Sequence, residues 1–311
     1  MTTNSASFAD IRALVQENAD LVLGKFAKEL SLSKQASVDA TIEYISKFVD
    51  LRIEHVEGGK LRGLICLSKS NWDSKHFDMA IGKISHTIFD PAMETSQRLR
   101  MFKRLRTESK GMGFRMIFGR LPLKDIRSVH AAEGGGARLM DILLTMRHET
   151  LNELGFGRDR TIDTATTDDL PHLQSIAAKV FSIDQFHANE FLDYERSSRL
   201  YSEWVSNSMT GSKGTILVVR DKERPIGFIL CRLHTIVPGH VVGVIDLVGS
   251  HPESMGQGVG SALVSGALEW FSSRVKSVYV GTQAANSPAI RLYERFAFRN
   301  IFAEATYHLR T

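Results

Sequence analysis

Residues 250–262 have the sequence SHPESMGQGVGSA, a glycine-rich stretch between a strand-like and a helix-like segment. The apolar run Val241 to Val248 precedes it, and the apolar spacing of Ala262 to Trp270 after it is typical of a helix. A turn from a strand into a helix directs free backbone N–H groups, and the positive end of the helix dipole, at one point. The stretch therefore predicts a phosphate-binding loop, with an ordinary turn that binds no ligand as the alternative.

Two common phosphate loops do not match this stretch. A Walker loop needs Lys and then Ser or Thr after its last glycine, whereas Val259 and Gly260 follow Gly258. The dinucleotide fingerprint needs G-x-G-x-x-G and an acid on the next strand. Here Gly256, Gly258 and Gly260 are spaced two apart, and residues 278–283 (VYVGTQ) contain no acid.

A second motif follows at residues 286–298, NSPAIRLYERFAF, which predicts a short helix with Asn286 as its N-cap. The glycine turn and the pattern N-x-x-A-x-x-x-Y-x-x-x-x-F together resemble the GNAT superfamily, whose members are acetyl-CoA-dependent N-acetyltransferases. The resemblance implies that the loop wraps the pyrophosphate of CoA and that Tyr293 protonates the departing thiolate. Two positions depart from the family pattern, which usually has Arg or Gln in place of Met255 and Gly in place of Ala297.

The resemblance assigns CoA contacts to the loop, to the strand before it and to the following helix. These residues are Val248, Ser250, Met255, Gly256, Gln257, Gly258, Val259, Gly260, Ser261, Asn286, Ala289 and Tyr293.

The second half of the chain predicts an α/β (α+β) GNAT fold, in which a mixed central sheet is flanked by helices. An antiparallel meander should precede a parallel crossover through the glycine turn. Strands are expected at 161–165, 215–220, 226–233, 241–248, 277–282 and 304–309. Helices are expected from Asp168 or Asp169 to 180, at 195–208, from the glycine turn to about 271, and around Tyr293.

The first half predicts helices at 8–29, 38–48, 91–110 and 125–132, and strands at 64–68, 115–120 and 138–146. Its strand, helix and strand order resembles part of the same fold without a second phosphate loop. We therefore expect a helical N-terminal extension (1–60), a degenerate GNAT-like domain that shapes the acceptor site (61–159) and a catalytic GNAT domain (160–311). Only the last should bind CoA.

Five segments, taken in order, resemble the TDP-fucosamine acetyltransferase group. They are NWDSKHF (71–77), IGKI (81–84), FSIDQFH (181–187), RLYSEWVSNS (199–208) and VGTQ (280–283). Enzymes of this group acetylate an amino group on a nucleotide-linked deoxysugar. The implied substrate-binding residues are Trp72, Asp73, Asp184, His187, Tyr201 and Gln283. Several have a structural alternative: the rings of Trp72 and Tyr201, like that of Trp204, could fill a core, Asp73 could be a turn or cap residue, and His187 could be a surface loop residue.

Direct acetyl transfer needs a base for the ammonium proton, a donor for the oxyanion and an acid for the thiolate. Backbone N–H groups of 248–250 are candidate oxyanion donors, because Gly249 allows an irregular strand there. The candidate base is Asp141, an acid within an apolar strand, since burying an unpaired carboxylate is costly. An outward-facing Asp141 is the alternative, and Asp246 is its rival as base.

The composition excludes several other classes. The 311 residues carry a net charge of +4, too small by itself to indicate a nucleic-acid partner. Only Cys66 and Cys231 are present, which predicts two buried thiols and neither a disulfide framework nor a metal site. No apolar run approaches the ~20 residues that span a bilayer, and no signal segment is present. We expect a cytoplasmic protein with no membrane partner.

Basic residues concentrate at one stretch, which predicts an amphipathic helix with a solvated basic face or, alternatively, attraction of an anionic substrate. They are Arg98, Arg100, Lys103, Arg104, Arg106, Lys110, Arg115 and Arg120. The expected partners are acetyl-CoA and a small-molecule amine on a nucleotide-linked sugar, and a homodimer is compatible with the sequence. The alternatives are acetylation of a protein N-terminus, lysine or small amine, or a non-catalytic CoA-binding scaffold.

Overall fold

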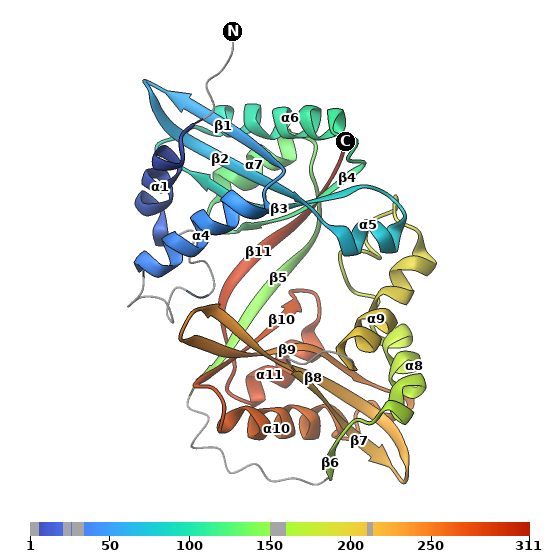
Figure 1. Ribbon diagram of the computed structural model, residues 1–311. Helices are drawn as coiled ribbons and strands as arrows, with labels where there is room; N and C mark the ends of the chain where they lie inside the picture. Colours follow the sequence, from blue (N-terminus) through green and yellow to red (C-terminus); the bar gives the residue numbers. More distant parts are fainter. Residues whose placement is uncertain (1–5, 21–25, 27–33, 150–159, 210–213) are drawn as a thin grey trace. The chain divides into compact units, whose positions relative to one another are not determined.

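The computed structural model describes residues 6–20, 26, 34–149, 160–209 and 214–311 (Figure 1). The chain forms two compact units, the first made of residues 1–142 and 302–311 and the second of residues 143–301. The unit boundaries fall within two strands, β5 (Arg138–Glu149) and β11 (Arg299–Arg310). They differ from the boundaries at 60 and 159 expected from the sequence, and residue 159 lies outside the described residues. That division stays a prediction.

The sheet of the first unit has the strand order β1-β2-β3-β4-β11. Pairing is antiparallel from β1 to β3, parallel between β3 and β4, and antiparallel between β4 and β11. The last strand of the chain therefore completes the sheet of the N-terminal unit. The other strands are β1 (Leu51–Glu57), β2 (Lys60–Lys69), β3 (Ile81–Phe89) and β4 (Met116–Pro122).

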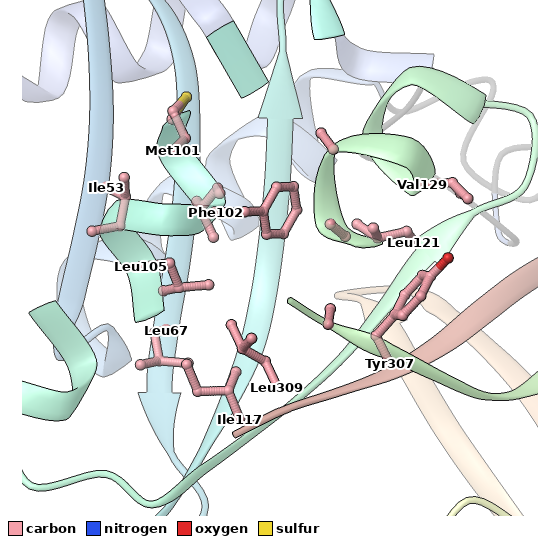
Figure 2. Close-up of a cluster of buried hydrophobic side chains, with 14 of the residues drawn as sticks. Ile53, Leu67, Met101, Phe102, Leu105, Ile117, Leu121, Val129, Tyr307 and Leu309 are labelled. Atoms are coloured by element: carbon pink, nitrogen blue, oxygen red, sulfur yellow. The ribbon is translucent and has the colours of Figure 1, made fainter. Parts of the chain in front are cut away.

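Helices cover both faces of this sheet. Alternate β2 residues belong to different cores: Leu67 packs with the α6 and α7 side, and Cys66 packs with α1 and α4. Figure 2 shows the first of these cores, with Phe102 of α6 against Ile117 of β4 and Leu309 of β11. The helices are α1 (Phe8–Glu17), α4 (Lys34–Phe48), α5 (Asn71–Phe77), α6 (Thr95–Gly111) and α7 (Ile126–Gly134).

The structure corrects several expectations in this half. The strands β1 and β3 and the helix α5 were not expected, and α6 begins at Thr95 rather than 91. The expected helix 8–29 ends at Glu17 in α1, and 21–25 and 27–29 lie outside the described residues. Arg98 is not on a solvated basic face, because its spacing from Met101 and Phe102 places it on the buried side of α6. There it donates to Asp125 over 2.6 Å.

The sheet of the second unit has the order β5-β10-β9-β8-β7-β6. The segment from β6 to β9 is an antiparallel meander, and β9 pairs with β10 in parallel through the crossover helix α10 (Val259–Ser272). The mixed sheet expected from the sequence is confirmed. Its strands besides β5 are β6 (Ile162–Thr164), β7 (Gly214–Asp221), β8 (Arg224–Val237), β9 (His240–Ser250) and β10 (Ser277–Gln283).

Helices also lie on both faces of the second sheet (Figure 1). One face packs Ile229 and Ile245 against Leu263 and Phe271 of α10, together with α11 (Ser287–Arg295). The opposite face packs Phe228 against the segment that follows α8 (Leu170–Val180). The remaining helix, α9 (Tyr194–Met209), contacts α8 and β7; the predicted stop before residue 211 lies outside the described residues.

A short 3₁₀ turn, Thr167–Asp169, precedes α8. Asp169 occupies the N-cap position as expected, but its side chain makes no capping hydrogen bond. It instead accepts two hydrogen bonds from Arg220, of 2.7 and 2.8 Å. These bonds hold the pKa of the Asp169 carboxyl at about 2, below its usual value. Asp169 thus joins β7 to the start of α8.

Among the described helices, none is long and apolar enough to cross a membrane.

Candidate functional site

The parallel strands β9 and β10 separate just before the glycine turn. Their register pairs are limited to 243–245 with 278–280. Beyond these pairs β9 continues to Ser250 along β8, and β10 continues to Gln283 along β5. After Ile245 and Val280, the two strands therefore no longer pair with each other in this described region. The irregular ladder expected at Gly249 is not found there: the β8–β9 register is regular at Gly249 and shifts between Leu230 and Cys231.

Gly249 also lies where a larger residue would not fit. A Cβ atom at this position would lie 3.1 Å from both Phe228 and Val180. Its neighbours Val248 and Ser250 are half-buried. The separated strand thus presents backbone groups of 248–250, the residues proposed to bind an oxyanion.

The glycine turn has the backbone conformation that the sequence predicts for an anion cradle. Gly256 and Gly258 have φ of +76° and +79°, in the left-handed region that L side chains rarely adopt. Gly258 is the N-cap of α10 and supplies no side chain, so the first N–H groups of that helix have no side-chain cap. Gly260 serves packing, because a Cβ there would lie 3.2 Å from Leu292 of α11.

The side chains of the loop make a smaller contribution than its backbone. Met255 is 67% exposed and extends from the turn. The Gln257 amide donates to the carbonyl of Glu253 over 2.8 Å. Val259 is buried in the core, while Ser261 is half-buried in the first turn of α10. The loop can therefore bind an anion mainly through its backbone N–H groups and the dipole of α10.

The motif around Tyr293 forms the short helix α11. The Asn286 side chain caps it by accepting from the N–H of Ala289 over 3.2 Å, as predicted. Ala297 has φ of +59°, so the left-handed turn at the helix end is made here without glycine. Tyr293 is 5% exposed and packs against Phe298 with ring centroids 5.6 Å apart. Burial raises the pKa of its hydroxyl, which keeps the proton on the oxygen.

Asp184 and His187 lie together in the segment between α8 and α9. One Asp184 oxygen accepts from the N–H groups of Phe186 and His187, over 2.7 and 2.9 Å. The other lies 2.7 Å from Nδ1 of His187, and Nε2 lies 3.2 Å from Oγ of Ser198 on α9. Asp184 and His187 therefore fix this segment to α9, and their contact with a substrate stays a prediction. Ser198 was missed because it carries no local motif.

The remaining predicted acceptor residues of the second unit lie on α9 and β10. Tyr201 is buried and stacks on Phe181 with centroids 4.6 Å apart, as in the core-filling alternative. Gln283 is half-buried at the end of β10, and its carbonyl accepts from the N–H of Asn286 over 2.9 Å. Gln283 thus lies at the junction between the separated strand and α11.

Asp246 is held in an ion pair that the sequence did not predict. Arg232 on β8 donates to both of its oxygens, over 2.6 and 2.8 Å. The hydrogen bond and the charge of Asp246 raise the pKa of Arg232. A carboxylate bound at both oxygens by a guanidinium is a poor proton acceptor, which weakens the case for Asp246 as the base.

Trp72, Asp73 and Asp141 belong to the first unit. Trp72 is 39% exposed rather than a core residue, and it stacks on His76 with centroids 5.2 Å apart. Asp73 accepts from the Ser70 hydroxyl in the first turn of α5. Asp141 on β5 has a buried oxygen, Oδ1, with no hydrogen-bond partner among the described residues. Such an oxygen costs about 1–3 kcal/mol unless a ligand or water satisfies it.

Neither cysteine is poised as a nucleophile. Cys66 and Cys231 are both buried and free. Burial raises the pKa of the Cys66 thiol to about 12 and also raises that of Cys231. Because the thiolate is the reactive form, both behave as core residues.

The separated parallel strands and the left-handed glycine turn are the features that the resemblance to acetyltransferases predicts. Residues 179–298 match the family model described as Acetyltransferase (GNAT) family. Residues 179–298 are therefore assigned to the GNAT family of acetyltransferases.

Among relatives, the chain is 23% identical over 262 residues to the spore coat polysaccharide biosynthesis protein SpsD of Bacillus subtilis, covering 81% of this chain and 84% of that protein. It is 29% identical over 113 residues to a mycothiol acetyltransferase of Arthrobacter sp., covering 36% of this chain and only 33% of that protein. The chain thus spans about a third of the mycothiol acetyltransferase.

Two solved structures resemble the fold over almost the whole chain. A GCN5-related N-acetyltransferase from Sphaerobacter thermophilus has a TM-score of 0.63 and 14% identity, covering 98% of this chain and 94% of its own. A tandem GNAT protein from the clavulanic acid biosynthesis pathway has a TM-score of 0.56 and 11% identity, covering 94% and 96%. At these identities the likeness concerns the fold alone.

Proposed function

We propose that the protein transfers an acetyl group from acetyl-CoA directly to the amino group of a nucleotide-linked deoxy-amino sugar. The observation that carries the donor half is the separation of β9 from β10 directly before the left-handed glycine turn. The acceptor half is supported by the likeness to SpsD, a polysaccharide biosynthesis protein of which the chain covers 84%. It is also supported by the exposed ring of Trp72.

The glycine turn would hold the pyrophosphate of acetyl-CoA through backbone groups. The N–H groups at the start of α10 have no side-chain cap, and Gly256 and Gly258 leave their approach open, since nothing lies within 4 Å of a Cβ at either position. Met255 supplies no charge at a position where the family usually has Arg or Gln. The backbone and the dipole of α10 therefore provide the attraction.

Three groups of the chain would then perform the transfer. Backbone N–H groups of 248–250 would stabilise the oxyanion that forms as the amine attacks the thioester carbonyl. As the carbon–sulfur bond breaks, Tyr293 would give its proton to the thiolate, and burial keeps that proton in place beforehand. Asp141 would take the ammonium proton through a water bound at its unpartnered oxygen. No acyl-enzyme is needed.

A screen for CoA thiol release tests this function. The full-length protein is incubated with acetyl-CoA and, separately, nucleotide-linked amino sugars, free amines and peptides. Release only with nucleotide-linked sugars supports the proposal, and product mass should rise by one acetyl group on the amine. Release only with peptides or simple amines contradicts the acceptor half. Failure to bind acetyl-CoA in calorimetry contradicts the donor half, whereas binding without thiol release favours the non-catalytic CoA-binding scaffold.

A further inference from the structure

A basic patch lies on the sheet of the first unit, on the face opposite α6 and α7. Ile117 and Leu121 of β4, and Tyr307 and Leu309 of β11, belong to the core beneath α6 and α7 (Figure 2). Because side chains alternate along a strand, the residues between them face the other side of the sheet. We name this set of residues the β3–β4–β11 patch; it comprises the exposed Lys83 and Arg120 and the buried Phe118, Thr306 and His308.

The strand register brings these five residues together. Lys83 of β3 is opposite Phe118, and Phe118 is opposite His308. Arg120 is opposite Thr306 on the same pair of strands. The rings of Phe118 and His308 stack with centroids 4.0 Å apart and planes 26° apart. The patch thus has a buried aromatic stack between two cationic side chains.

The two cations of the patch have no ion-pair partner among the described residues. Lys83 and Arg120 both reach solvent, and neither makes an ion pair or hydrogen bond through its side chain with the described part of the chain. They are close enough to interact: burial and the charge of Arg120 lower the pKa of Lys83, and Asp73 opposes this. Two neighbouring like charges repel each other, so an anion bound between them would be stabilising.

His308 supplies no charge to the patch. Burial, followed by the charge of Arg120, lowers its pKa to about 3. Its ring is therefore neutral near neutral pH, and the positive charge comes from Lys83 and Arg120.

Two buried hydroxyls beside the cations also have no partner. Thr306, opposite Arg120, is 1% exposed, and its hydroxyl makes no hydrogen bond among the described residues. The hydroxyl of Ser68 on β2, which is opposite Lys83, likewise makes no hydrogen bond among the described residues. Buried hydroxyls are ordinarily hydrogen-bonded, and oxygen atoms held by the adjacent cations would supply the missing partners after a small rotation.

We propose that the β3–β4–β11 patch binds the diphosphate of a nucleoside diphosphate, with Lys83 and Arg120 as the charged ligands. Trp72, whose neighbour Asp73 interacts with Lys83, presents an exposed ring suited to stacking a nucleobase. This inference rests on the proposed function, because such a group would be the nucleotide part of the acceptor. It assigns that part to the first unit, apart from the CoA loop.

Calorimetry with full-length protein at low ionic strength tests the site without any acetyl transfer. The probes are uridine diphosphate, thymidine diphosphate and CoA. Replacing Lys83→Gln and Arg120→Gln together should weaken nucleoside diphosphate binding by about tenfold or more and leave CoA binding unchanged. Arg120→Lys should lose less affinity for nucleoside diphosphates than Arg120→Gln, because lysine keeps the charge but not the planar guanidinium fork.

The matched control is the double variant Arg100→Gln and Lys103→Gln. Both residues are exposed on α6, on the opposite face, and the change in net charge is the same. An equal loss in the control would show a net-charge effect and overturn the site. So would absence of nucleoside diphosphate binding by the wild type, or a loss of CoA affinity in the patch variant. If binding behaves as expected but no nucleotide sugar is acetylated, the proposed function fails and the site stands.

Asp73→Asn gives an independent check. Its carboxylate favours the charged form of Lys83 but repels an anion nearby. Removing it should strengthen nucleoside diphosphate binding about two- to fivefold, by the order of a surface charge interaction. Weaker binding would show that Asp73 supports the ligand and that the anion is not bound beside Lys83.

Discussion

The two units are suited to two different kinds of recognition. In the second unit the glycine turn offers backbone N–H groups, and its exposed side chain Met255 is apolar. In the first unit the β3–β4–β11 patch offers side chains, Lys83 and Arg120, from different strands. A backbone cradle needs glycines at fixed spacing and so leaves a motif, whereas side chains gathered from separate strands leave none. The proposed donor site can therefore be recognised in the sequence, whereas the proposed nucleotide site cannot.

The largest effect should come from Tyr293→Phe, which removes the proposed acid and little packing volume. We expect kcat to fall roughly 100- to 1,000-fold with unchanged affinity for acetyl-CoA, as for loss of a general acid. Steady-state kinetics and calorimetry measure the two quantities. Tyr44→Phe on α4 is the control, since its ring is partly exposed in the other unit. Full activity in Tyr293→Phe would contradict the proposed role of Tyr293 as the acid.

Asp141→Asn should have the next largest effect, a fall in kcat of roughly 100-fold. The loss should be greatest at low pH, where more of the acceptor amine carries a proton that must be removed, and should shrink as pH rises. The pH–rate profile of Asp246→Asn serves for comparison, because its carboxylate is engaged by Arg232. If Asp246→Asn changes the profile and Asp141→Asn does not, the base belongs to the second unit.

Asp169→Asn should affect stability and leave both sites intact. The Arg220 hydrogen bonds lower the pKa of Asp169 from 3.8 to about 2, so the folded state favours the ionised form. This contribution, about 2 kcal/mol, is present above about pH 4 and is lost as pH falls toward 2. Urea unfolding at neutral and acid pH should therefore show a difference from wild type that disappears in acid. Asp163→Asn, a more exposed partner of Arg220, should cost less than about 1 kcal/mol.

Local features were predictable because neighbouring residues determine them. The N-cap at Asn286 and the turn at Gly256 and Gly258 depend on residues within a few positions. The strands with which the last strand pairs could not be predicted from the sequence. The apolar alternation of the last strand is satisfied by any partner strand, and one of its partners is β4 of the first unit.

Long-range polar contacts were missed for the same reason. Arg98 belongs to a run of basic residues in the sequence. In the structure it is buried and donates a hydrogen bond to Asp125, 27 positions away. Asp246 was expected as a rival base because only the pairing register of β8 with β9 identifies its partner on β8. Lys83 and Arg120 each belonged to a segment noted in the sequence, but only the sheet places them on one face.

The smallest effect tests whether the donor site is made of backbone. Gly258→Ala introduces a Cβ at φ +79°, and Gly239→Ala does so at φ +83° in the β8–β9 hairpin; neither Cβ would meet an atom within 4 Å. Both should lower the free energy of unfolding by about 1–2 kcal/mol through the same left-handed strain. Only Gly258→Ala should also weaken acetyl-CoA binding, by about tenfold, as the turn shifts away from its left-handed conformation. Equal affinity in the two variants would mean that side chains hold the donor as well, and the contrast between the units would disappear.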